Sequence, residues 1–383
     1  MPRLLIPLAT LTLAASACGP GEGRPPTDQP SEGVVDEEGT DLTAPGILTA
    51  ACGSGEVTLT LLSDEDGTEL SARTFDTDSV TGGESEHFPF GHAVLPQEGS
   101  VRGVDCENAD PFLNDRELLF VSFVEELDGT EVNGFGVVDE AGTLTALSPP
   151  RDTGDFTVLS DYTRPHLDRE RNRIVFVEQE GDEGDGTVHA LDLGSGETTP
   201  IGECETHCHT ITLPPGAESP LFGLATHRIV VDPGSGLAAA SHGAYEPSVF
   251  LFDPGSESTD GFPEFSYGTG EPTNVMGEVA HMFEGPSLLV ENDELTVVEF
   301  TAEDLTADGA VGDDLGSRTL VPPSERTNTS PQPSPDGTEI VFLSETESGE
   351  ASWYRVPFDG STEPERISDV PAEHLGSTIV AWQ

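Results

Sequence analysis

Short apolar runs separated by polar turns recur along this chain. In the clearest case, the turn Pro335-Asp336-Gly337 leads into the apolar run 340–343, and a second run, 353–358, ends at Asp359-Gly360. Proline fixes φ at the second position of a tight turn and glycine accepts positive φ, so both turns reverse the chain between strands. The pattern predicts antiparallel β-structure, and no window of about 11 residues shows a helical period.

Weaker copies of this unit precede it. The first apolar strands of the copies are spaced by 56, 63, 51 and 52 residues, counted from Leu118 through Ile174, Leu237 and Leu288 to Ile340. This period suits the blades of a β-propeller with insertions in some loops. The hairpin made by residues 57–62 and 69–75 supplies a sixth unit.

We therefore predict an all-β fold in which residues 46–383 form a single β-propeller of six blades. Five or seven blades, or a β-sandwich, are the alternatives. The run 378–382 is a last short strand, and we expect it to pair with the first unit, because closing the ring removes a free strand edge. The composition allows a core, since 34% of the 383 residues are hydrophobic.

Residues 1–17 have the features of a secretory signal peptide. Arg3 precedes the apolar run 4–13, and small residues at 14–17 lead to Cys18. The run is too short to span a bilayer, which needs about 20 helical residues. Small residues before a cysteine resemble the bacterial lipobox, so the resemblance implies that Cys18 is lipidated. Ordinary signal-peptidase cleavage is the alternative.

Residues 18–45 predict a disordered acidic linker, because they contain several prolines and acidic residues and few apolar ones. Lipoproteins retained at the inner membrane can carry aspartate after the lipidated cysteine, where this chain has Gly19. We therefore expect an exported protein, lipid-anchored to the outer membrane and facing the periplasm or the cell surface. The lipid anchor would be its sole contact with the membrane.

The charge balance excludes several functions. The chain has 72 acidic and 15 basic residues, which gives a formal net charge of −57, and all 15 basic residues are arginine. This charge excludes ordinary nucleic-acid binding, and the lack of lysine excludes catalytic-lysine chemistry. Because salt screens self-repulsion, we expect a saline environment and a stability that rises with added NaCl.

Four cysteines follow Cys18, an even number that favours disulfides in an exported protein. We expect Cys204 to pair with Cys208, which leaves Cys52 to pair with Cys106. The stretch from Cys204 to His209 contains two thiols and two imidazoles, so a zinc or copper site is the alternative there.

The final repeat resembles the TolB-type β-propeller repeat. The resemblance is carried by residues 333–344, with Tyr354, Asp359-Gly360 and Arg366-Ile367 behind them. It implies a non-enzymatic, lipid-anchored propeller that binds a protein partner in the bacterial cell envelope and needs no cofactor. The chain also lacks the nucleophile elbow, the His-Glu-x-x-His motif, the P-loop and the dinucleotide fingerprint. A metal-dependent polysaccharide lyase or hydrolase and a passive surface lipoprotein are the alternative functions.

Two groups of residues are candidate sites. Some propeller lyases that resemble this family hold a divalent metal with channel histidines, which points to His166, His242 and His281. The arginine cluster is a candidate anion site, because guanidinium groups bind carboxylates and phosphates through paired hydrogen bonds; its members are Arg164, Arg169, Arg171 and Arg173. Local pairing with Asp161, Asp168 and Glu170 is the alternative for the cluster.

Overall fold

The structure is a computed structural model of the chain. It describes residues 42–383 except 54, 85, 95, 104–111, 114–116, 128–129, 152–159, 170, 181–185, 205–209, 213–220, 224–225, 233–237, 243–247, 253–263, 266–270, 277, 284–286, 292–293, 300–314 and 371–376. Among these residues, no helix has the length and apolar character needed to cross a bilayer.

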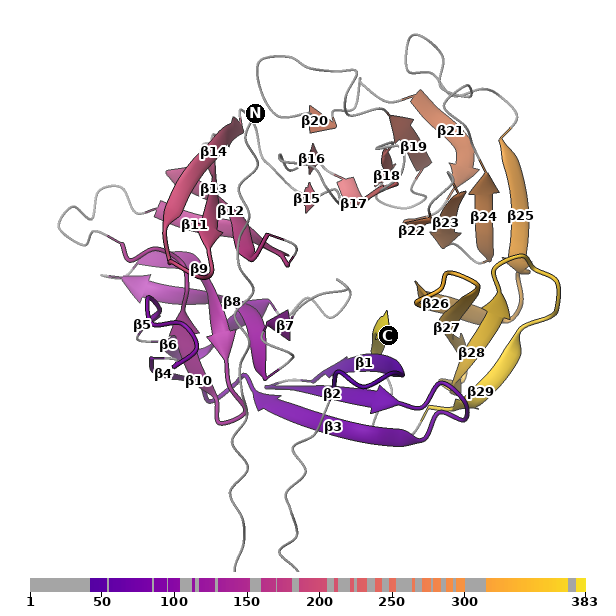
Figure 1. The fold of residues 1–383 in the computed structure, drawn as a ribbon, viewed down its shortest axis with the longest axis horizontal. Helices are drawn as coiled ribbons and strands as arrows, with labels where there is room; N and C mark the ends of the chain where they lie inside the picture. The colour runs from indigo at the N-terminus through magenta and orange to yellow at the C-terminus, as the bar shows by residue number, and fades with distance from the viewer. Residues whose placement is uncertain are drawn as a thin grey trace, which may run out of the picture. The chain divides into compact units, whose positions relative to one another are not determined.

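The described elements are strands that form seven sheets (Figure 1). Five sheets have four strands each, and we call them blades 1 to 5. Blade 1 contains β30 (Thr378–Trp382), β1 (Ile47–Cys52), β2 (Glu56–Leu62) and β3 (Glu69–Asp76). Blade 2 contains β11 (Ser160–Asp168), β12 (Arg173–Glu180), β13 (Gly186–Asp192) and β14 (Thr198–Cys204).

The other three blades follow the same order from first to last strand. Blade 3 contains β17 (Thr226–Val231), β18 (Ala238–His242), β19 (Ser248–Phe252) and β21 (Glu271–Met276). Blade 4 contains β22 (Glu278–Phe283), β23 (Ser287–Glu291), β24 (Leu295–Glu299) and β25 (Gly316–Val321). Blade 5 contains β26 (Arg326–Pro333), β27 (Glu339–Thr346), β28 (Ala351–Pro357) and β29 (Glu365–Asp369).

Two sheets are irregular. The wide sheet has seven strands: β4 (Thr81–Gly82), β5 (His92–Ala93), β6 (Pro96–Gly103), β7 (Phe112–Leu113), β8 (Leu118–Leu127), β9 (Thr130–Val138) and β10 (Thr143–Ala146). The small sheet has three: β15 (Thr210–Thr212), β16 (Leu221–Gly223) and β20 (Glu264–Phe265). The fold is therefore all-β and a single β-propeller, as predicted.

The predicted number of six blades is wrong. Each of the six sequence repeats coincides with a sheet, but only five of these sheets are regular four-stranded blades. The repeat that begins near Leu118 forms the wide sheet, because short strands from residues 81–113 add to both edges of β8–β10. The longest spacing, between Ile174 and Leu237, contains two strands of the small sheet, β15 and β16, whereas its third strand, β20, follows later in the chain.

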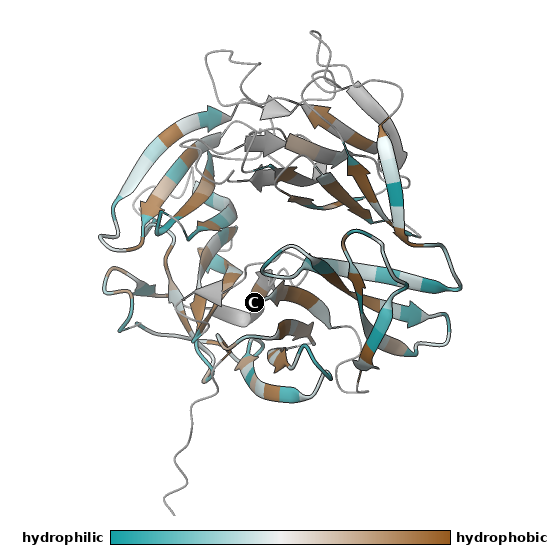
Figure 2. Ribbon diagram, turned by 45° about the vertical axis from the view of Figure 1, so that its right-hand side comes forward, coloured by the Kyte–Doolittle hydropathy of each residue, from teal (hydrophilic) through white to brown (hydrophobic). Residues whose placement is uncertain are grey.

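The hydrophobic core lies between successive sheets. Buried clusters join blade 1 to the wide sheet, the wide sheet to blade 2, blade 3 to blade 4, blade 4 to blade 5, and blade 5 back to blade 1. The central strands are therefore buried on both faces, so they read as unbroken apolar runs. In β12, the four residues from Ile174 to Val177 are all fully buried. Figure 2 shows apolar (brown) residues within the strands and hydrophilic (teal) residues at many turns.

The last strand closes the ring, as expected. β30 pairs antiparallel with β1, and Ile47 lies opposite Trp382. Beyond the strand, the backbone N–H groups of Gly46 and Gln383 each donate to the other residue's carbonyl at 2.9 Å. The side-chain amide of Gln383 also donates to the carbonyls of Leu42 at 2.7 Å and Ala44 at 2.8 Å. Residues 42–46 are thereby fixed to the closing strand.

Blade 1 also contacts blade 5 through the turn between β2 and β3. The Asp66 carboxylate accepts from the backbone N–H of Thr68 at 3.1 Å, and Gly67 has a φ of +69°. A Cβ atom at Gly67 would overlap the Ser368 hydroxyl of β29. Glycine is therefore required here by both its backbone conformation and its close approach to the neighbouring blade.

We expect Gly67→Ala to destabilise the protein more than Gly337→Ala. Gly337 has the same φ of +69°, but a Cβ atom added there would meet no other atom within 4 Å, so it is a matched control for the backbone term. The left-handed backbone conformation costs an alanine roughly 1–2 kcal/mol at either position. The overlap with Ser368 adds to this cost only at Gly67. Urea unfolding of both variants measures the difference. Equal losses of unfolding free energy would contradict a tight contact between the two blades.

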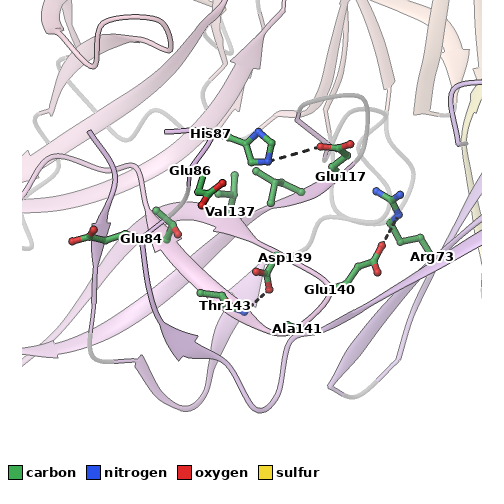
Figure 3. A pocket seen from close by; sticks show the side chains of 12 residues that line it. Arg73, Glu84, Glu86, His87, Glu117, Val137, Asp139, Glu140, Ala141 and Thr143 are labelled. Carbon is green, nitrogen blue, oxygen red and sulfur yellow. Dashed lines mark hydrogen bonds and ion pairs between the residues drawn. The ribbon is translucent and has the colours of Figure 1, made fainter. Parts of the chain in front are cut away.

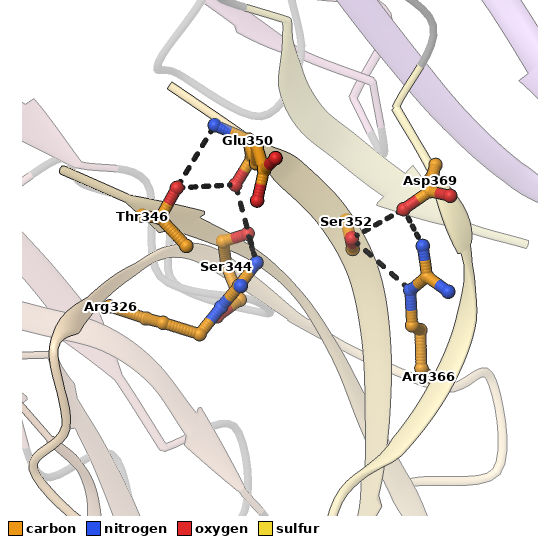
Figure 4. Close-up of polar contacts among 7 residues, drawn as sticks. All are labelled: Arg326, Ser344, Thr346, Glu350, Ser352, Arg366 and Asp369. Carbon is orange, nitrogen blue, oxygen red and sulfur yellow. Dashed lines mark hydrogen bonds and ion pairs between the residues drawn. The ribbon is translucent and has the colours of Figure 1, made fainter. Parts of the chain in front are cut away.

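Two of the residues that carry the repeat resemblance, Ser344 and Arg366, form hydrogen bonds between strands of blade 5 (Figure 4). Arg326 of β26 donates to the Ser344 hydroxyl at 2.9 Å and to the Ser344 carbonyl at 2.6 Å in β27. Arg366 of β29 donates to the Ser352 hydroxyl at 3.3 Å, and that hydroxyl donates to Asp369 at 3.0 Å. These contacts join adjacent strands, so the polar side chains of Ser344 and Arg366 have a structural role in the blade.

Candidate functional site

A cavity of about 490 Å³ lies where blade 1 meets the wide sheet (Figure 3). Its apolar lining comes from Leu118, Val137 and Ala141. Five acidic residues also line it: Glu84, Glu86, Glu117, Asp139 and Glu140. The cavity is thus lined by five carboxylates and by two groups that can carry positive charge, Arg73 and His87.

The turn between β9 and β10 forms one side of the cavity. The Asp139 carboxylate accepts from the Thr143 N–H at 2.8 Å, and the backbone groups of Asp139 and Thr143 bond at 3.2 Å. Gly142 closes the turn with a φ of +76°. Because this turn is fixed by its own hydrogen bonds, Glu140 is held at its tip.

Glu140 pairs with an arginine of the neighbouring blade. The Nε atom of Arg73, in the middle of β3, lies 2.6 Å from Glu140 Oε1. The Arg73 side chain is 14% exposed, whereas that of Glu140 is 53% exposed. The ion pair therefore connects blade 1 to the wide sheet at the rim of the cavity, as Figure 3 shows.

The remaining carboxylates are weakly neutralised. His87 lies 3.9 Å from Glu117, and both side chains are about half exposed, so this contact contributes little energy. Within the described part of the chain, neither Glu84 nor Glu86 forms an ion pair. Carboxylates accept hydrogen bonds from guanidinium and ammonium groups. The cavity is therefore suited to a positively charged group.

The predicted channel histidines lie on different blades. His166 is on β11 and His281 on β22, the first strands of blades 2 and 4, whereas His242 is on β18, a second strand whose histidine side chain is outside the described set. Desolvation by the surrounding protein lowers the pKa of His166, and Asp168 partly opposes that shift. His281 packs edge-on against Phe283 at 4.8 Å between ring centres.

No metal site follows from these histidines in the described structure. Among the side chains that it describes, no three His, Cys, Asp or Glu residues form a group that could hold a metal ion. The divalent metal at His166, His242 and His281 stays a prediction.

The arginine cluster is engaged in local pairing where its side chains are described. Asp168 Oδ2 lies 2.8 Å from Nε of Arg173 and 3.1 Å from Nη1 of Arg171. Burial alone would raise the pKa of Asp168, but hydrogen bonds from Arg173 and Arg171 outweigh it and lower the pKa. These two arginines therefore make the local pairing named as the alternative, and anion binding by them stays a prediction.

The other two members of the cluster are Arg164 and Arg169. Arg169 is exposed and has a contact of its own, and the side chain of Arg164 is outside the described residues. Asp161, expected as a partner, instead accepts from the Asn133 side chain at 2.8 Å. Anion binding by Arg164 and Arg169 stays a prediction.

Arg151, which no sequence pattern singled out, links the wide sheet to blade 2. Its side chain is 6% exposed and donates to Glu125 at 3.1 Å and to the Ser160 carbonyl at 2.8 Å. The guanidinium carbon also lies 4.8 Å from the centre of the Tyr162 ring. Desolvation lowers the pKa of Arg151, and Glu125 opposes the shift. All its described contacts are internal, so we assign it a structural role.

The cysteine pairing is only partly visible. Cys52, the last residue of β1, is disulfide-bonded, and its partner is outside the described side chains. Cys18, Cys106 and Cys208 are outside the described residues, and so is the side chain of Cys204. The pairings of Cys52 with Cys106 and of Cys204 with Cys208 stay predictions.

Several solved structures are similar to this chain at low level. TolB from Acinetobacter baumannii shares 10% identity over 84% of this chain and 68% of that one, with a TM-score of 0.33. Oligogalacturonate lyase from Vibrio parahaemolyticus shares 10% over 86% and 75%, with a TM-score of 0.34. A chain of the nidogen/laminin complex shares 10% over 88% and 97%, with a TM-score of 0.37.

The sequence comparisons give no family. No family model matches the chain, and no curated protein matches it. The structural similarities are too low to carry a function from any of those proteins to this chain, so function is argued from the cavity.

Proposed function

We propose that this protein is a non-enzymatic binding scaffold of the bacterial cell envelope, anchored by lipid at Cys18 to the outer membrane. The anchor is supported by the signal-like residues 1–17 and by the acidic, proline-rich segment that follows them. The binding role is supported by the cavity, because ligand sites are concave and combine an apolar lining with a few converging polar groups.

The observation that carries the proposal is the carboxylate lining of this cavity. Five acidic side chains meet Leu118, Val137 and Ala141 in one hollow between two sheets. The partner is therefore a protein that presents a basic side chain on an otherwise partly apolar surface. The electrostatic field of a protein with a net charge of −57 would also raise the association rate of such a basic partner.

Recovery of the lipid-anchored protein from its own membranes in mild detergent tests this function. We expect a consistent protein partner with the wild type and its loss when Glu84, Glu86 and Glu117 are all changed to Gln. A control that changes Glu345, Glu347 and Glu363 to Gln removes the same charge from exposed positions of blade 5 and should keep the partner.

Two results would contradict the proposal. Equal recovery of the partner with both triple variants would show that the cavity is not the binding site. Absence of any consistent partner with the wild type would favour a passive surface lipoprotein.

A further inference from the structure

Of the two basic side chains that line the acidic cavity, Arg73 and His87, only the histidine can change its charge near neutral pH. Imidazole groups gain a proton between about pH 8 and 5, whereas guanidinium groups stay charged in proteins. The Nε2 atom of His87 lies 3.9 Å from Oε2 of Glu117, and the histidine side chain is 48% exposed. The imidazole is therefore open to exchange of protons with water and close to a carboxylate.

The charged groups that share the cavity with His87 come from several parts of the chain. They are Glu84 and Glu86 beside it in sequence, Glu117 just before β8, Asp139 and Glu140 in the turn between β9 and β10, and Arg73 on β3. Arg73 forms its ion pair with Glu140, and Figure 3 shows this pair apart from the contact between His87 and Glu117. The arginine charge is constant with pH, so the change in positive charge within the cavity comes from His87.

Protonation of His87 would weaken the binding of a basic group among the glutamates in two ways. The imidazolium and the basic group repel each other, because both carry positive charge. A protonated imidazole also donates charge-assisted hydrogen bonds, so it would hold the Glu117 carboxylate and make it less available to the ligand. Both effects have the same sign, so affinity is highest while the imidazole is neutral and falls as the pH falls.

We propose that His87 makes binding at the cavity depend on pH, so that the neutral imidazole permits binding of the partner's basic side chain and the protonated imidazole weakens it. This inference rests on the proposed function and names the regulation of the same site. Two like unit charges about 4 Å apart in water repel enough to change an affinity about fivefold. Because His87 is half exposed, this water-like value is the one that applies.

Binding of a small basic probe at two pH values tests the inference. The probe is the end-capped tripeptide Leu-Arg-Ala, which carries one guanidinium group between apolar neighbours, in about 0.1 M NaCl. NMR shifts of the protein amides give its Kd. We expect the wild type to bind about fivefold more weakly at about pH 5.5 than at pH 7.5, a range in which imidazole groups titrate and most glutamate carboxyl groups stay ionised.

Two substitutions at His87 hold its charge constant. His87→Gln should bind the tripeptide equally at both pH values, with the affinity that the wild type has at the higher one. His87→Arg should bind weakly at both. His189→Gln is a matched control, because His189 lies on β13 of blade 2 and does not line the cavity; this variant should keep the pH dependence of the wild type.

The protonation state of His87 gives a readout that a merely structural role would not change. Because coupling between two binding events is reciprocal, a probe that binds better to the neutral imidazole must also favour loss of its proton. Near pH 6.5 we therefore expect added tripeptide to move the imidazole NMR signals of His87 toward those of the neutral form. The spectrum of His87→Gln identifies these signals.

Three results would overturn the inference. They are equal affinity of the wild type at both pH values, a fivefold pH dependence that remains in His87→Gln, and no binding of the tripeptide at the higher pH. If the membrane partner depends on Glu84, Glu86 and Glu117 but is recovered equally at both pH values, the scaffold function stands and its regulation by His87 is wrong. If no partner depends on these three glutamates, the proposed function fails whatever the tripeptide does.

Discussion

A chain that ends at Ser377, and so lacks β30, should lose most of its folding stability. Ile379 and Val380 are each 1% exposed and belong to different core clusters, one toward blade 5 and one toward the wide sheet. Deleting a large buried side chain costs about 2–5 kcal/mol. The backbone hydrogen bonds between β1 and β30 are lost as well. The sum is comparable to the roughly 5–15 kcal/mol by which domains are stable.

Thermal unfolding followed by circular dichroism measures this effect. We expect the truncated chain to unfold at a much lower temperature, over a broader range, and to self-associate through the exposed edge of β1. Gln383→Ala is the control, because it removes only the two side-chain hydrogen bonds to Leu42 and Ala44, worth about 1 kcal/mol each. A truncated chain that unfolds like the wild type would show that β30 does not close the ring.

Added NaCl should raise the unfolding temperature strongly. The chain has 72 acidic residues and 15 arginines, and several arginines are already engaged with single acids, as Arg73 is with Glu140. Most carboxylates therefore repel one another, and folding brings them closer together. Salt reduces this repulsion, because the Debye length falls from about 10 Å at 0.1 M to about 3 Å at 1 M.

Melting temperatures between low salt and molar NaCl test this expectation. Glu345, Glu347 and Glu363 lie on the exposed surface of blade 5, so changing all three to Gln should raise stability at low salt and make less difference at high salt. Sucrose of equal osmolality separates charge screening from general solvent exclusion. A melting temperature that stays flat with NaCl would contradict the idea that self-repulsion limits stability.

The strands that could be predicted from sequence are those buried on both faces. β27 reads as an unbroken apolar run because blade 4 packs on one of its sides and blade 1 on the other. In β12, Ile174 to Val177 are likewise all buried. The first strand of blade 5 gave no such signal. β26 is rich in polar residues and proline, and its register shifts around Ser330, which has a φ of +54°. Neither hydrophobic alternation nor turn chemistry identifies such a strand.

The candidate site could not be predicted from sequence, because it depends on how two sheets pack. Arg73 and Glu140 are far apart in the chain and meet only where blade 1 contacts the wide sheet. Residues 84–87 lie in the part of the chain where the repeat is weakest, so the periodicity did not predict which strand or turn they belong to. The arginine cluster could be found from sequence because its members are close in the chain. Its role could not, because the sequence does not show that Arg171 and Arg173 both pair with Asp168.

Blade 1 combines strands from distant parts of the chain, and this affects the order of folding. Three of its strands come from residues 47–76 and the fourth from residues 378–382, so β1 must wait with one edge open while all the other sheets are synthesised. Contacts between such distant segments form late, because the entropy of closing the intervening loop must be overcome first. Folding intermediates of this protein should therefore be most vulnerable to aggregation and proteolysis at β1, and a chaperone that covers this strand until β30 is made would protect them.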